Sequence, residues 1–265
     1  MCPWGRRLFN GDGRYLEPAR LVCHVLLIEL ADGLALVDTG LGEADVRNPR
    51  LLDPGTRMLI RPQLIASETA LSQIRALGHD PSDVRHIVLT HADFDHAGGI
   101  ADFPSAEVHI FAGEHRALTA PPLRERIRYR VAGHNWAHGP KWVTHEIDGD
   151  DWFGFQSVRV LPAGDADVTM VPLAGHSLGH TGIGVRREDG WLLHAGDAFF
   201  NHGQIQTPPR CPPGLTVFQA MVQADGGQRR ANVERLRELA ARHSDAVTVI
   251  CAHDPVQLEQ QQARS

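Results

Sequence analysis

Cysteine is scarce in this chain, and its spacing excludes several kinds of site. The 265 residues contain four cysteines, and no two of them form a Cys-x-x-Cys pair. Zinc ribbons and thioredoxin-like redox sites depend on such pairs, so neither is expected here. A disulfide framework is also not expected in a chain of this length. Because free thiols are typical of a reducing compartment, we expect a cytoplasmic protein.

The chain also lacks a strong charge of either sign and any long apolar run. Its formal net charge is −6, which does not favour binding to nucleic acid or to an anionic membrane. No apolar stretch approaches the roughly 18 residues that cross a bilayer. Residues 1–7 lack the apolar core of a signal peptide. We therefore expect a small-molecule substrate and neither a nucleic-acid nor a membrane partner, and the oligomeric state stays open.

Apolar patterning predicts a series of hairpins and helices. Residues 22–30 and 34–37 are predicted strands joined through Asp32-Gly33, a dipeptide typical of hairpin turns. Helices are predicted over about 61–78 and 228–243, where apolar residues recur on one helical face. Further strands are predicted at 87–90, 108–111, 158–161, 169–173, 182–185, 191–194 and 247–251. Hairpins in each half, with helices between them, favour two packed sheets covered by helices on the outside.

The segment from Ile87 to Gly99 is the most informative part of the chain. Its apolar run ends in four potential metal ligands within six residues: His91, Asp93, Asp95 and His96. Buried charges without a partner are very costly, so these side chains must face water or hold a cation. A strand that leads into Gly98-Gly99 would fix the ligands and leave a coordination position open.

Four further features accompany this segment in order along the chain. They are Asp38-Thr39-Gly40, Gly175-His176-Ser177-Leu178-Gly179-His180-Thr181, Gly196-Asp197 and His253. Together with the His-x-Asp-x-Asp-His run, they resemble the metallo-β-lactamase superfamily over roughly residues 20–255. The family pattern is His-x-His-x-Asp-His, so Asp93 stands where that family has its second histidine.

The resemblance implies a fold and a metal centre. The implied fold is α/β, a four-layer αββα sandwich with mixed and antiparallel sheets, in a single domain over residues 1–265. An insertion at about 119–142 would lie near the active site. The implied ligands of a first ion are His91, Asp93 and His176; those of a second ion are Asp95, His96 and His253; and Asp197 bridges the two. Asp38 would orient ligands through hydrogen bonds, whereas His180 is expected to make local hydrogen bonds.

The implied cofactor is a pair of divalent metal ions. Zinc is the first choice, and manganese or iron is the alternative because Asp93 adds an oxygen ligand and no cysteine belongs to the ligand set. Aspartate in place of histidine also makes the ligand shell of two divalent ions and one hydroxide neutral instead of +1. Asp93 could ligate in a working two-metal site, which we favour, or the first metal position could be partly empty. We therefore predict that Asp93→His raises zinc occupancy. The alternative interpretation is that each ligand is only a partly exposed polar residue at a strand end.

The implied activity is hydrolysis of an ester-like bond by a hydroxide that bridges the metals, with Asp95 as the catalytic residue that returns a proton to the leaving group. A lactone is the favoured substrate. The alternatives are a thioester or phosphodiester hydrolase, a metal-binding regulator without turnover, and an iron-dependent redox enzyme. Serine hydrolysis has no support, because no Gly-x-Ser-x-Gly motif is present.

The segment 119–142 carries a run of arginines and two tryptophans, and each of these features allows two interpretations. Arg124, Arg126, Arg128 and Arg130 could bind a carboxylate or phosphate, or could form a solvated face. Trp136 and Trp142 could line an acyl pocket or could simply pack in the core.

Overall fold

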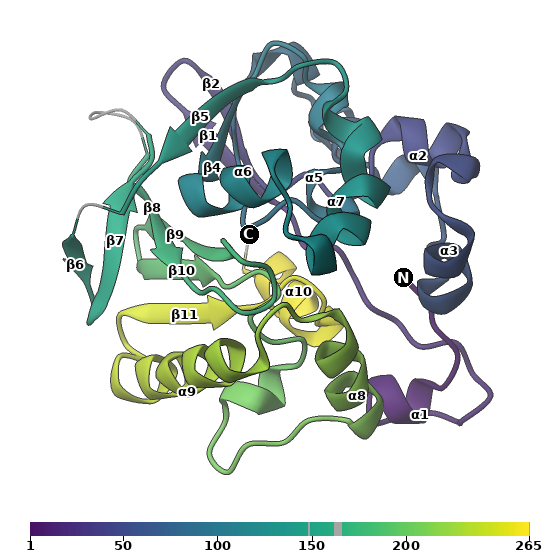
Figure 1. Ribbon diagram of the computed structural model, residues 1–265. Coiled ribbons are helices and arrows are strands. Elements are labelled where there is room, and N and C mark those ends of the chain that lie inside the picture. The colour runs from purple at the N-terminus through teal and green to yellow at the C-terminus, as the bar shows by residue number, and fades with distance from the viewer. Residues whose placement is uncertain (148, 162–165, 265) are drawn as a thin grey trace.

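Two β-sheets pack face to face, and helices cover their outer faces (Figure 1). The computed structural model describes residues 1–147, 149–161 and 166–264, with residues 130 and 131 described by their backbone alone. The first sheet has the strand order β1-β2-β3-β4-β5 and the second has the order β11-β10-β9-β8-β7-β6. The predicted α/β sandwich of two mixed sheets is therefore confirmed.

The first sheet is built from the first half of the chain. Its strands are β1 (Leu26–Leu30), β2 (Gly33–Val37), β3 (Val84–Val88), β4 (Glu107–Phe111) and β5 (Lys141–His145). The hairpin of β1 and β2 is antiparallel, whereas β2 to β5 pair in parallel. Parallel neighbours need long crossovers, and these carry α4 (Ala70–Ala76), α6 (Ala112–Thr119) and α7 (Arg126–Ala132).

The second sheet is mostly antiparallel. Its strands are β6 (Asp150–Trp152), β7 (Phe155–Arg159), β8 (Val168–Pro172), β9 (Thr181–Arg187), β10 (Gly190–His194) and β11 (Val247–Ile250). Among the described pairings of this second sheet, only β10 and β11 pair in parallel. The helix α9 (Gly226–Arg242) forms their crossover, and its buried face is Val233, Leu236 and Leu239.

Shorter elements connect these strands and helices. The remaining α-helices are α1 (Arg6–Phe9), α2 (Glu43–Arg47), α3 (Pro54–Ile60), α5 (Phe94–Ala97), α8 (Pro213–Val222) and α10 (Pro255–Gln262). The 3-10 helices are η1 (Pro49–Leu51), η2 (Ala66–Glu68), η3 (Pro81–Asp83), η4 (Ile100–Asp102), η5 (Leu123–Glu125), η6 (Gly133–Trp136) and η7 (His202–Ile205). Within the described ranges, none of the helices has the length and apolarity that crossing a bilayer requires.

The core follows the alternation of side chains along each strand. Ala35 and Val37 of β2 pack with Met170 and Ile183 of the opposite sheet. The neighbouring Leu36 points to the other face, where its cluster includes residues of α4 and α6. This period of two buries both faces of the sheet and produces the four layers.

Several sequence boundaries were wrong. The strand predicted at 87–90 is Val84–Val88, and the strand predicted at 158–161 is Phe155–Arg159. The helix predicted over 61–78 is only Ala70–Ala76, because Thr69 caps it through a hydrogen bond from the Ser72 amide. Leu64 before it has a left-handed φ of 53°, which a continuous helix cannot contain. The strand predicted from residue 22 begins at Leu26, since the preceding residues pair with the loop after β11 instead.

Candidate metal centre

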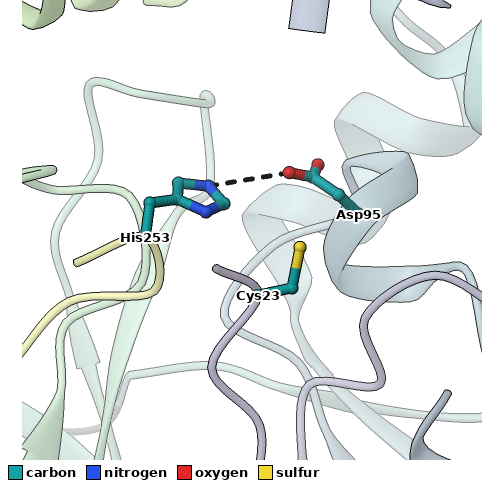
Figure 2. A group of neighbouring side chains, drawn as sticks. All are labelled: Cys23, Asp95 and His253. Atoms are coloured by element: carbon teal, nitrogen blue, oxygen red, sulfur yellow. Dashed lines mark ion pairs between the residues drawn. The ribbon is translucent and has the colours of Figure 1, made fainter. Parts of the chain in front are cut away.

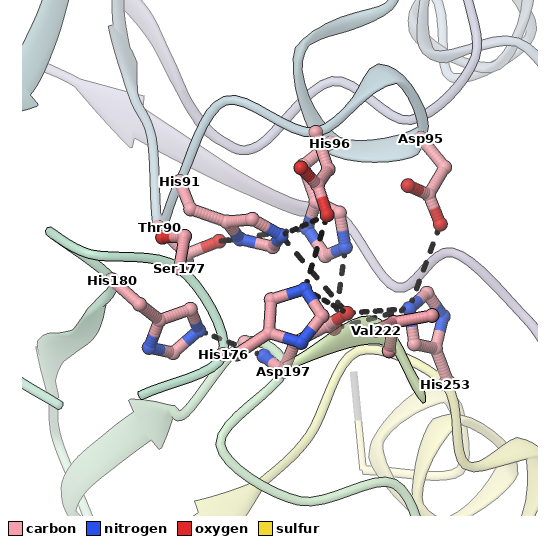
Figure 3. Close-up of polar contacts among 12 residues, drawn as sticks. Thr90, His91, Asp95, His96, His176, Ser177, His180, Asp197, Val222 and His253 are labelled. Atoms are coloured by element: carbon pink, nitrogen blue, oxygen red, sulfur yellow. Dashed lines mark hydrogen bonds and ion pairs between the residues drawn. The ribbon is translucent and has the colours of Figure 1, made fainter. Parts of the chain in front are cut away.

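The predicted ligands form one cluster, and Figure 3 labels six of the seven: His91, Asp95, His96, His176, Asp197 and His253. His91 follows β3, and Asp95 and His96 lie on the short helix α5 directly after it. His176 lies in the loop between β8 and β9. Asp197 follows β10, and His253 follows β11. The structure thus brings both halves of the chain to a single cluster.

The three residues predicted for the first ion form one group. Oδ2 of Asp93 lies 3.4 Å from Nε2 of His91 and 3.0 Å from Nε2 of His176. One ligand atom from each of the three residues lies within 4.8 Å of the others. Both histidines are buried, whereas Asp93 is partly exposed, with 16% of its side chain accessible.

Asp197 lies between this group and the residues predicted for the second ion. Its Oδ2 is 3.3 Å from Nε2 of His176, and its Oδ1 is 3.2 Å from Nε2 of His96. The same Oδ1 is 3.0 Å from Nε2 of His253. Asp95 is farther out, with Oδ2 at 3.6 Å from Nε2 of His253. A carboxylate that faces both groups has the position that a bridging ligand needs.

The unpaired nitrogen and oxygen atoms of the cluster are of the kinds that bind metal cations. Four of them are buried and make no well-aligned hydrogen bond with any described residue: Nε2 of His91, Nε2 of His96, Oδ1 of Asp93 and Oδ1 of Asp197. Leaving such atoms unpaired is costly, and imidazole nitrogens and carboxylate oxygens are ligands for zinc and related divalent ions. The residues present therefore fit a centre of two divalent metal ions.

The electrostatics of the cluster favour ionised carboxylates and a neutral imidazole at His176. Burial opposes protonation of His96 and His253, but Asp197 outweighs it and holds the pKa of both imidazoles well above the ordinary value. Burial opposes ionisation of Asp197, but His253, His96 and His176 outweigh it and hold its pKa well below the ordinary value. Burial also opposes ionisation of Asp93, and Arg128 and His91 lower its pKa in the same way. Burial is the main reason that the pKa of His176 falls to about 4. The carboxylates and His176 therefore have the protonation states that metal ligands require, whereas a cation would have to displace a proton from His96 and from His253.

A second set of residues fixes the orientation of the ligands. Oδ2 of Asp38 lies 2.8 Å from Nδ1 of His96 and accepts a hydrogen bond from the Thr90 hydroxyl. Nε2 of His180 accepts a hydrogen bond from the Asp197 amide, and its Nδ1 lies 3.2 Å from the Leu173 carbonyl. Asp38 thus contacts the predicted ligand His96 directly, and His180 makes the local hydrogen bonds expected of it.

Cys23 belongs to the cluster, although it was absent from the predicted ligand set. Its sulfur lies with a carboxylate oxygen of Asp95 and a ring nitrogen of His253, all within 4.8 Å of one another (Figure 2). The segment before β1 reaches this place because the Val22 carbonyl lies 2.6 Å from Nδ1 of His253. No local spacing rule connects a single cysteine to a histidine 230 positions later.

Glu114 is a second residue that the sequence did not single out. It is fully buried at the start of α6, and its carboxylate accepts hydrogen bonds from the Ala92 amide and the Tyr129 hydroxyl. It also accepts hydrogen bonds from the Ser177 hydroxyl and the Gly179 amide. One carboxylate therefore ties the loop that carries His91 to the loop that carries His176.

The segment 119–142 contributes Arg128 to the centre. The guanidinium of Arg128 points inward, with Nη1 at 2.5 Å from Oδ2 of Asp93. The neighbouring Arg124 and Arg126 are exposed, and the side chain of Arg130 lies outside the described residues. Arg124 and Arg126 therefore belong to a solvated face, as one of the two interpretations predicted. Arg128 instead contacts the predicted ligand Asp93.

The tryptophans of the same region belong to the core. Trp136 and Trp142 both pack against the cluster on the helical side of the first sheet. Their contacts there are ordinary packing, and the apolar side chain beside the ligands is Phe200. Its ring centroid lies 4.9 Å from that of His253 and 6.0 Å from that of His176.

Comparison with known proteins agrees with this geometry. A sequence profile described as the metallo-beta-lactamase superfamily matches residues 18–253. A "probable metallo-hydrolase" of Mycobacterium tuberculosis is 47% identical over 240 residues, which cover 89% of this chain and 75% of that protein. An N-acyl homoserine lactonase of Azorhizobium caulinodans is 28% identical over 238 residues, which cover 86% of this chain and 80% of that protein.

Solved structures share the fold. A B. thuringiensis structure with N-decanoyl-L-homoserine bound at its active site matches with a TM-score of 0.68 and 20% identity, covering 98% of this chain and 92% of that chain. An N-acyl homoserine lactone hydrolase with N-hexanoyl-L-homoserine bound at its catalytic metal centre matches with the same TM-score, identity and coverage. At this identity, the likeness establishes the architecture alone.

Proposed function

The chain belongs to the metallo-β-lactamase superfamily, and from this membership we propose that it hydrolyses the ester bond of a lactone at a centre of two divalent metal ions. The observation that carries the proposal is the position of Asp197, whose carboxylate lies 3.3 Å from Nε2 of His176 and 3.2 Å from Nε2 of His96. Relatives that are N-acyl homoserine lactonases support the substrate class. We infer likewise that residues 1–265 act as one domain, because both halves supply ligands.

The proposed ligand set assigns three residues to each ion. His91, Asp93 and His176 would hold the first ion; Asp95, His96 and His253 would hold the second; and Asp197 would be shared by the two positions. When bound, two divalent ions lower the pKa of water and stabilise the negative charge that develops on a substrate oxygen. Zinc is the proposed metal, with manganese or iron as alternatives because carboxylate oxygens contribute three of the ligands.

Asp95 is the proposed proton carrier. Its carboxylate has fewer constraints than that of Asp93, which is paired with Arg128, or that of Asp38, which holds Thr90 and His96. Oδ2 of Asp95 lies 3.6 Å from His253 at the outer side of the cluster. A carboxylate in this position can hold a proton and give it to the leaving alcohol oxygen of an opened ester.

The relatives are our reason for ranking an acylated lactone above the phosphodiester alternative, because N-acyl homoserine lactonases are among them. Phe200 contacts the rings of His176 and His253, but its side chain is only 1% exposed, so these contacts are core packing.

The test is a substrate panel with metal-depleted and metal-reloaded protein. We expect turnover of an N-acyl homoserine lactone after zinc, manganese or iron is restored, and loss of turnover in Asp197→Asn. Hydrolysis of a thioester or phosphodiester alone would overturn the lactone assignment. Metal binding without turnover of any substrate would favour a regulator, and redox cycling of bound iron would favour an oxygen-dependent enzyme.

A further inference from the structure

Arg128 is fully engaged at the edge of the metal centre. Its Nε donates to Glu125 at 3.1 Å, and its Nη1 lies 2.5 Å from Oδ2 of Asp93 and 3.2 Å from Nε2 of His176. Its Nη2 donates to the carbonyl of His176 at 3.0 Å and to the carbonyl of Val222. These acceptors match the five N–H groups of a guanidinium, so the side chain is fixed in place.

The atoms that Arg128 contacts are the proposed ligand atoms. Oδ2 of Asp93 and Nε2 of His176 face each other at 3.0 Å, and both lie next to Nη1 of Arg128. An imidazole nitrogen has one lone pair, which either accepts a hydrogen bond or binds a metal. A cation at this position therefore competes with a guanidinium that is already bound there.

The charge of Arg128 also balances the departure from the family pattern. A neutral histidine at position 93 would contribute no charge, whereas Asp93 contributes −1. With Arg128 at 2.5 Å, the pair of residues again contributes zero. The side chain of Arg128 is only 13% exposed, so solvent screens this charge weakly.

We propose that Arg128 is a resident cation of the metal centre that shares the ligand atoms of Asp93 and His176 with the first metal ion and weakens the binding of that ion. The proposal rests on the proposed function for the identity of the two ion positions. Its consequence is unequal affinity. The position formed by Asp95, His96 and His253 fills first, and the position beside Arg128 fills only at higher metal concentration.

The test is a zinc titration of metal-depleted protein against a chromophoric chelator. The wild type should bind one zinc ion tightly and one weakly, whereas Arg128→Gln should bind the weaker ion at least about tenfold more tightly, since removal of a unit charge a few ångströms away changes cation affinity by that order. Arg126→Gln is the matched control, because Arg126 lies on the same helix and is exposed. Equal affinities in Arg128→Gln and Arg126→Gln, or weaker binding in Arg128→Gln, would overturn the proposal.

A second variant covers the case in which Arg128→Gln does not fold, because that change leaves the charge of Asp93 unpaired. Arg128→Lys keeps the charge but cannot span the same acceptors. We expect it to bind the weaker ion more tightly than the wild type, by a smaller factor than Arg128→Gln. Unchanged affinity in Arg128→Lys would count against competition for the ligand atoms.

The zinc titration and the substrate panel test the two proposals independently. If zinc affinity responds to Arg128 but no lactone is cleaved, the role of Arg128 stands and the lactone assignment is wrong. If lactones are cleaved but substitution of Arg128 leaves zinc affinity unchanged, the proposed function stands and this inference is wrong.

Discussion

Oδ2 of Asp38 lies 2.8 Å from Nδ1 of His96, although 58 positions separate the two residues. The same carboxylate accepts hydrogen bonds from the amide and the hydroxyl of Thr90. This arrangement turns the other ring nitrogen of His96 toward Asp197. A residue at the end of β2 therefore sets the direction of a proposed ligand on α5.

Asp38→Asn is expected to weaken zinc binding by about 10- to 100-fold, because the residues that orient a metal-binding histidine have effects of this size. Competition with a chelator measures the affinity. Asp32→Asn, at the exposed turn between β1 and β2, is the control. Zinc affinity in Asp38→Asn equal to that of the control would show that His96 does not need this contact.

Asp93 and Arg128 are expected to act as a pair. Asp93→His alone removes the carboxylate from a largely buried guanidinium and should lower stability by roughly 1–3 kcal/mol. The double variant Asp93→His/Arg128→Gln should recover this loss and raise zinc occupancy above that of Asp93→His. Thermal unfolding and metal analysis of the wild type, the two single variants and the double variant measure the coupling free energy between residues 93 and 128. Strictly additive effects would show that the two side chains are independent.

The proximity of Cys23 to Asp95 and His253 predicts metal-dependent reactivity. Zinc should slow alkylation of Cys23 severalfold, because a cation held by its neighbours blocks or binds the thiolate. Cys2 and Cys211 are also partly accessible and lie outside the metal-binding groups, so they serve as internal controls. Mass spectrometry of iodoacetamide-treated protein resolves each site. An equal alkylation rate at Cys23 with and without zinc would place the sulfur away from the ion.

Asp102 provides a pH-dependent prediction away from the metal centre. Burial, together with the carboxylates of Glu43 and Asp45, raises its pKa from 3.8 to about 6. A raised carboxyl pKa means that the folded state binds more protons than the unfolded state in this range, so its contribution to stability falls as pH rises between these values.

Asp102→Asn should therefore be more stable than the wild type at pH 7, by on the order of 1 kcal/mol after allowance for solvent screening, and the advantage should vanish near pH 4. Urea unfolding of both proteins at several pH values measures the difference. The Glu43 amide, which donates to Asp102, retains an acceptor in asparagine. A stability difference that does not change with pH would contradict the assigned pKa.

The predictable part of the site is the part encoded locally. His91, Asp93, Asp95 and His96 lie within six residues, so one strand end and one helical turn bring them together. The long helix α9 was also predictable, because its buried residues follow the helical period. Family resemblance supplied His176, Asp197 and His253, which no local pattern connects to the first group.

The unpredicted part depends on tertiary contacts. Cys23, Glu114 and Arg128 reach the centre from three different segments, and each has an ordinary local sequence. Arg128 differs from its exposed neighbour Arg126 only in the direction that α7 gives it. The helix predicted over 61–78 failed for a similar reason, since apolar residues such as Ile65 and Leu77 are exposed in the fold.

Native mass spectrometry of zinc-saturated protein tests the central claim most directly. The claim is that Asp197 joins two ion positions built from both halves of the chain. The wild type should carry two zinc ions per chain at saturation, and Asp197→Ala should retain at most one. A wild-type chain that never takes up a second ion, or an Asp197→Ala chain that still carries two, would contradict the account.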